Sequence, residues 1–180
     1  MAVIESLAFD INTPDKLKQI DGIHEWPVVY IINDSEEAYI GETVNVATRS
    51  GQHWQKNERK KLTTINIITD DNYNKSVVLD LENFLIKYMS ADGKFKLQNG
   101  NGGLQNHRYY DCENYEKSFR GVWKELISRN LAEHTLTDIE NSDLFKYSPY
   151  KALTFDQYEI VDKILQALAE DYDSEEGNTI

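Results

Sequence analysis

Residues 38 to 54, AYIGETVNVATRSGQHW, hold side chains that suit phosphate chemistry. Arg49 carries a planar, permanently charged guanidinium that can bind two phosphate oxygens, a task for which lysine is a poorer match. His53 follows four residues later, so on a helix it would share a face with Arg49 and could hydrogen-bond a neighbour or relay a proton. Tyr39 precedes both. We therefore expect these three side chains to face one phosphate.

A second tyrosine lies on the segment just before this stretch. Residues 28–32 and 38–41 are apolar runs with β-strand character, separated by the polar residues 33–37, which is typical of a β-hairpin. Tyr30 and Tyr39 then lie on adjacent antiparallel strands. Taken singly, such tyrosines usually pack in a core and a helical arginine usually lies in water, so only the joint pattern points to function.

One acidic residue interrupts the apolar side of a predicted helix over residues 75–89, KSVVLDLENFLIKYM. On a helical wheel Glu82 lies inside the apolar arc, whereas Asp80, Asn83 and Lys87 share the polar wedge. A carboxylate facing the core is costly unless it is paired, hydrogen-bonded or bound to a metal. The alternative is a Glu82 at the edge of the stripe that reaches water or a structural arginine.

The ordered set of Tyr30, the triplet Tyr39-Ile40-Gly41, Asn45, Arg49, His53, Glu82 and an asparagine-rich loop resembles the GIY-YIG nuclease domain. The first triplet of that family is represented here by Val28-Val29-Tyr30, which keeps only the tyrosine. The loop offers Asn99, Asn101 and Asn106 for the closing asparagine, and we favour Asn99 because it follows the short segment FKLQ.

The resemblance implies a metal-dependent phosphodiester hydrolase with catalytic residues Tyr30, Tyr39, Arg49, His53, Glu82 and Asn99. Tyr30 would be the general base or part of the network that activates water, and Tyr39 would orient the water or the phosphate. An unperturbed phenol is a weak base near neutrality, so this role requires a lowered pKa. Glu82 would be the single protein ligand of Mg²⁺ or Mn²⁺, and Arg49 would stabilise the pentavalent phosphate.

The charge distribution argues against general affinity for nucleic acid. The chain of 180 residues has a formal net charge of −12, which repels phosphates, and the residues after 169 are strongly acidic. A basic patch nevertheless follows Arg49. We expect DNA contacts from Lys56, Arg59, Lys60 and Lys61, and the sequence does not separate DNA from RNA.

Composition indicates one folded domain with a helical appendage. The single Cys112 fits a reducing compartment, and the chain has neither a signal peptide pattern nor a membrane-spanning run, so we expect a cytoplasmic protein. Further helices are expected from Thr13 to Ile20 and over residues 115–130 and 155–171, with a third strand at residues 64–69. The predicted fold class is α+β, with a small, mainly antiparallel three-stranded sheet flanked by helices.

A second resemblance lies near the C-terminus. Residues 151–165, KALTFDQYEIVDKIL, are similar to the helix before the Walker A loop of helicase-like P-loop ATPases, in which Gln157 would contact adenine. A capping box of Thr154 and Gln157 explains the same residues. No Walker A loop occurs in the sequence. The expected layout is a helical lead-in over 1–25, a GIY-YIG-like domain over 26–111, and over 112–180 a helical extension leading to an ATPase domain in cis that is absent from this chain.

Two functions are compatible with these observations. The first is a metal-dependent DNA endonuclease domain of a larger nuclease-ATPase. The second is a catalytically inactive module with the same fold that docks a partner or regulates an ATPase, which the high negative charge favours.

Overall fold

The computed structural model describes residues 2–23, 25–99, 112–147, 160 and 163–164. Its centre is a five-stranded sheet in the order β1-β4-β2-β3-β5. The strands are β1 (Val3–Ala8), β2 (Val28–Asn33), β3 (Glu37–Thr43), β4 (Thr64–Thr69) and β5 (Lys96–Leu97). All pairs are antiparallel except β3 with β5. The predicted α+β class and the predicted hairpin are confirmed, but the sheet has five strands and not three.

The two strands that the sequence did not reveal are the outer ones. β1 pairs along its whole length with β4, from Val3 opposite Thr69 to Ala8 opposite Thr64. Only Ile4 of β1 is buried, so the strand lacks the alternating apolar pattern that would have predicted it. The N-terminal region is therefore not purely a helical lead-in, because helix α1 covers only Thr13–Leu17.

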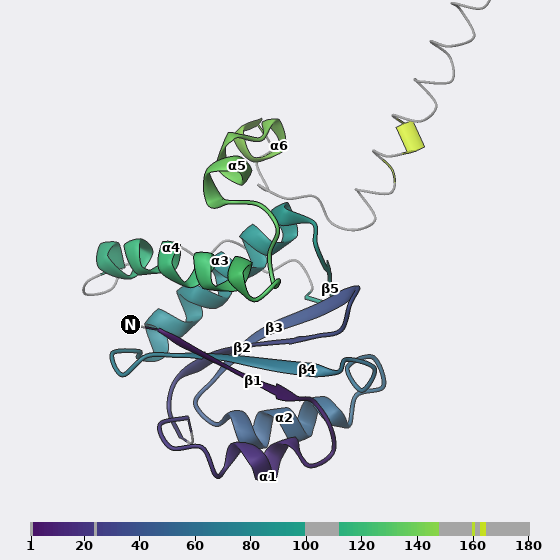
Figure 1. Cartoon of the computed structure of the whole chain (residues 1–180), viewed down its shortest axis with the longest axis vertical. Coiled ribbons are helices and arrows are strands. Elements are labelled where there is room, and N and C mark those ends of the chain that lie inside the picture. The colour runs from purple at the N-terminus through teal and green to yellow at the C-terminus, as the bar shows by residue number, and fades with distance from the viewer. Residues whose placement is uncertain (1, 24, 100–111, 148–159, 161–162, 165–180) are drawn as a thin grey trace, which may run out of the picture.

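Both faces of the sheet are covered by helices (Figure 1). Every residue of the central strand β2 is buried, as is typical of a strand with helices on both sides. Val28, Tyr30 and Ile32 belong to the core shared with α1 and α2 (Val46–Trp54). Val29 and Ile31 belong to the core shared with α3 (Lys75–Asp92) and α4 (Cys112–Ser128).

Helix α3 is the long helix that the sequence predicted, extended to Asp92. Asn74 caps its start, and Gly93 ends it with φ 75°, a left-handed conformation that favours glycine. The sequence placed Asp80 on a solvent-facing wedge, but Asp80 is buried. It lines a small pocket with Tyr115, Ser118 and other residues of α3 and α4. The prediction failed because α4 covers a side of α3 that a single-helix wheel assigns to water.

The C-terminal helices pack on the α3 side of the sheet. Helices α4, α5 (Leu136–Asn141) and α6 (Asp143–Tyr147) add Trp123, Leu136 and other side chains to that core. The predicted helix over 155–171, including Gln157, lies outside the described residues apart from 160, 163 and 164. Within the described part of the chain, no helix has the length and apolarity needed to cross a bilayer.

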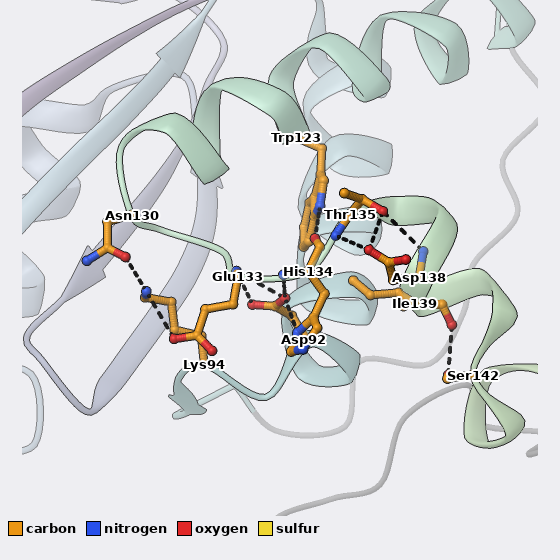
Figure 2. Close-up of polar contacts among 10 residues, drawn as sticks. All are labelled: Asp92, Lys94, Trp123, Asn130, Glu133, His134, Thr135, Asp138, Ile139 and Ser142. Carbon is orange, nitrogen blue, oxygen red and sulfur yellow. Dashed lines mark hydrogen bonds and ion pairs between the residues drawn. The ribbon is translucent and has the colours of Figure 1, made fainter.

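A buried carboxylate joins the end of α3 to the start of α5 (Figure 2). Asp92 accepts hydrogen bonds from the backbone amides of Glu133 and His134, the latter at 2.7 Å. His134 Nδ1 also lies 3.1 Å from the same carboxylate. Next to it, Thr135 and Asp138 form a capping box for α5. Asp92 therefore fixes the helical extension to the sheet domain.

Candidate active site

Three rings gather between the β2–β3 hairpin and helix α2. Tyr30 Oη lies 2.8 Å from His53 Nε2, and both side chains are buried. The Tyr39 ring lies 4.8 Å from the His53 ring and 6.3 Å from the Tyr30 ring, measured between centroids. Tyr30 and Tyr39 share the α2 side of the sheet. The structure thus brings these three predicted site residues together.

Gly41 makes room for the Tyr30 phenol. The two residues are opposite each other in the β2–β3 register. A Cβ atom at position 41 would lie 2.4 Å from Tyr30 Oη and 2.6 Å from its Cζ, far inside contact distance. The glycine of the YIG triplet is therefore required by the close approach of the tyrosine hydroxyl to the backbone of β3.

Helix α2 holds Arg49 and His53 one turn apart. Its N-cap is Asn45, whose side chain accepts a hydrogen bond from the Thr48 amide. Thr43 Oγ1 accepts a hydrogen bond from the Asn45 amide. This turn sets the register that points Arg49 and His53 toward the tyrosines.

The Arg49 guanidinium interacts with both phenols. Its hydrogen bond to Tyr30 is the main reason that the pKa of Arg49 is raised, and Tyr39 adds a smaller contribution. The pKa of Tyr30 is raised, chiefly because the phenol is buried and also because Tyr39 is close, while Arg49 opposes the shift. The protein alone therefore does not supply the lowered Tyr30 pKa that a general base requires.

Glu82 lies half-buried on α3, where its carboxylate interacts with Glu42 of β3. Burial raises the pKa of Glu82 to about 7, and the nearby Glu42 carboxylate adds to the shift. Lys75, the backbone of Glu42 and Arg49 act in the opposite direction. Lys75 forms an ion pair with Glu42. Glu82 is therefore partly shielded from solvent, and its charge makes only a small contribution at Tyr30, as that of Arg49 does at Glu82.

Part of the edge of β3 is open, and it borders both the α2 face and the α3 face of the sheet. β5 pairs with β3 only at Glu37 and Ala38, so beyond Ile40 the described residues give this edge of β3 no strand partner. Alternation along β3 turns Gly41 toward α2 and Glu42 toward α3. The Glu82 carboxylate of α3 interacts with the Glu42 backbone at this edge.

Asn99 binds to the backbone of β3. Its Oδ1 accepts from the Ile40 amide at 2.9 Å, and its Nδ2 donates to the Ile40 carbonyl at 2.8 Å. Both halves of the carboxamide are thus used by the YIG strand, which gives Asn99 a structural position beside the site. Asn101 and Asn106 lie outside the described residues.

The predicted basic patch is only partly a free surface. Lys56, Lys60 and Lys61 are exposed, and Lys60 lies over the Trp54 ring. Arg59 is only 9% exposed, with its Cζ 3.4 Å from the centroid of the Tyr39 ring. Arg59 therefore belongs to the ring cluster of Tyr30, Tyr39 and His53. The chain neighbours of Arg59 are all polar, so the sequence alone predicts an exposed side chain at this position.

The donor set at Glu82 fits a hard divalent cation. Mg²⁺ commonly uses one or two carboxylates and takes its other ligands from water and substrate phosphate. Burial and the Glu42 carboxylate outweigh the groups that favour the charged form of Glu82, so a bound cation would favour that form further. Among the described residues no group of three or more His, Cys, Asp or Glu could hold an ion, so water and substrate would complete the coordination.

These features define an α+β domain with a phenol, guanidinium and carboxylate site at a strand edge. Comparison with protein families gives a match between residues 27–96 and the GIY-YIG catalytic domain. The fold agrees with this family, and the match indicates a nuclease domain. Comparisons with curated proteins and with solved structures gave no match.

Two residues near Glu82 were not identified from the sequence. Glu42 directly follows the YIG triplet, and strand alternation from Tyr39 could have placed it on the opposite face. Lys75 lies seven residues before Glu82, a spacing that puts both on one side of a helix. The sequence held both signals, but their meaning depends on α3 lying against β3.

Proposed function

We propose that this chain is a metal-dependent endonuclease domain that hydrolyses phosphodiester bonds of DNA at the open edge of β3. The observation that supports this most strongly is the cluster of Tyr30, Tyr39 and His53 beside Arg49, within the residues that match the GIY-YIG catalytic domain. Arg49 would bind the phosphate and stabilise its extra negative charge in the transition state. Tyr30 would take part in proton transfer to or from the attacking water.

A divalent ion held by Glu82 would supply charge neutralisation on the phosphate and would make water and phenol more acidic. Tyr39 would orient the phosphate from the neighbouring strand, and His53 would hold the Tyr30 oxygen in place. The exposed Lys56, Lys60 and Lys61 would contact flanking phosphates. Because the chain carries a net charge of −12, we expect weak intrinsic affinity for DNA.

We also propose that this domain belongs to a larger protein. The resemblance of residues 151–165 to an ATPase segment supports an ATPase domain in cis that would bring affinity and specificity. With no bilayer-spanning helix among the described residues and no cysteine pair in the sequence, we propose a cytoplasmic location.

The test is nicking of supercoiled plasmid DNA by the purified protein with Mg²⁺ or Mn²⁺. We expect relaxed circles that vanish on chelation, and Glu82→Gln should reduce the rate about 100-fold or more. Lys124→Gln, on the exposed side of α4, is the matched control and should leave the rate unchanged. No nicking by the parent protein, with no divalent-ion binding by calorimetry, would favour the inactive docking module.

A further inference from the structure

Arg59 is a buried cation whose place in the site needs an explanation. Its Nη1 lies 3.3 Å from His53 Nδ1, and its plane covers the Tyr39 ring. Within the described residues it forms no ion pair, and its Nε has no hydrogen-bond partner. Burying a guanidinium without a carboxylate is costly, so packing alone is a poor reason for its presence.

The contact with His53 determines where the imidazole carries its proton. Every polar atom of a guanidinium is an N–H donor, so His53 Nδ1 must be the acceptor in this contact. Burial, together with Arg59 and Arg49, lowers the pKa of His53 to about 3, so the ring is neutral at pH 7. A neutral imidazole has one donor and one acceptor nitrogen. Nε2 therefore carries the proton and donates it to Tyr30 Oη over 2.8 Å.

We propose that Arg59 is a positioning residue that fixes the Nε2–H tautomer of His53, so that the Tyr30 oxygen is held as a hydrogen-bond acceptor. The Tyr30 proton then cannot be shared with His53 and is left for transfer on the substrate side. Hydrogen bonds donated by His53 and Arg49 favour the phenolate over the phenol. The catalytic meaning rests on the proposed function, but the tautomer does not.

The tautomer is measured directly by ¹⁵N NMR of the imidazole rings, with His53→Gln used to assign the His53 signals. We expect a protonated Nε2 and an unprotonated Nδ1 near pH 7. His134 is an internal reference, because its Nδ1 faces the Asp92 carboxylate and must carry a proton there. A protonated Nδ1 on His53 would overturn the proposal, whether or not the protein cleaves DNA.

Two variants separate positioning from packing. Arg59→Met keeps the length and apolar contact but removes the donor, so His53 should populate the Nδ1–H tautomer and nicking should fall about 10-fold. Arg59→Lys again presents only donors. It should restore the Nε2–H tautomer and most of the rate.

An Arg59→Met protein that folds, as judged by circular dichroism, and keeps only the Nε2–H tautomer would refute the proposal. If Arg59→Met does not fold, the test is the ¹⁵N NMR spectrum of the parent protein, in which a protonated Nδ1 on His53 would refute the proposal. A parent protein that shows Nε2–H but never cleaves DNA would support this inference while refuting the proposed function.

Discussion

At the scale of single residues, the ring cluster explains which atoms can exchange protons. The pKa of His53 is lowered to about 3 mainly by burial, so the folded protein holds this ring neutral across the physiological range. With the proposed Nε2–H tautomer, a neutral His53 donates a hydrogen bond to Tyr30. Its low pKa also makes it a source of acid instability.

The stability of the fold should fall as the pH is lowered from about 6.5 toward 3. In that window the unfolded chain protonates His53 and the folded chain does not, so the free energy of unfolding should drop by up to about 1.4 kcal/mol per pH unit. Urea unfolding as a function of pH measures this. His53→Gln should flatten the slope in that window, and an unchanged slope would show that His53 is not held neutral.

The affinity for a divalent metal ion should depend on pH through Glu82. Because the pKa of Glu82 is raised to about 7, protons compete with a cation over the range below it. The affinity for Mn²⁺ should weaken roughly tenfold per pH unit below pH 7. Calorimetric titrations at pH 6 and pH 8 test this, and a pH-independent affinity would exclude Glu82 as the ligand.

Gly41 provides a steric test of the site. Gly41→Ala would place Cβ 2.4 Å from Tyr30 Oη, so Tyr30 must move. We expect a loss of about 1–3 kcal/mol in stability and of most activity. The control is Gly121→Ala on α4, where a Cβ has nothing within 4 Å, and it should stabilise the protein by about 0.5–1 kcal/mol. Equal effects of the two substitutions on the melting temperature would refute this account of Gly41.

At the scale of elements, local patterns predicted much of the site. The hairpin, helix α2 and helix α3 carry strong periodic or turn signals, so Tyr30, Tyr39, Arg49 and Glu82 could be assigned to elements from the sequence. The outer strands could not be predicted, because β1 is mostly exposed and β5 has only two residues. The burial of Asp80 and Arg59 depends on contacts between elements, which no single-segment pattern contains.

Asn99 links one of these short elements to the site. Its carboxamide replaces a strand partner for Ile40, so Asn99→Ala should cost about 1–2 kcal/mol and loosen the open edge of β3. Amide hydrogen exchange should accelerate at Ile40. The control is Asn72→Ala, because the exposed Asn72 side chain donates to Asp70 and not to β3 within the described residues. Unchanged protection of Ile40 would show that Asn99 does not hold the edge.

At the scale of the whole molecule, the helical extension shares a core with the sheet domain, and the buried Asp92 carboxylate adds a polar link between α3 and the start of α5. Asp92→Ala would leave the amides of Glu133 and His134 without an acceptor, at a cost of about 2–4 kcal/mol. Asp138→Ala, which breaks only the α5 capping box, should cost about 1 kcal/mol. Hydrogen exchange should show α5 opening in Asp92→Ala while β2 and β3 stay protected. Loss of protection in β2 as well would mean that the two parts fold as one unit.

The most direct test of the central claim is a crystal of the protein with Mn²⁺ and a short DNA duplex, measured for anomalous scattering. The claim is that Glu82 and Arg49 serve one phosphate at the open edge of β3. The account predicts a Mn²⁺ ion bound to the Glu82 carboxylate, with a phosphate that contacts both the ion and Arg49. DNA bound elsewhere, with no ion at Glu82, would contradict it.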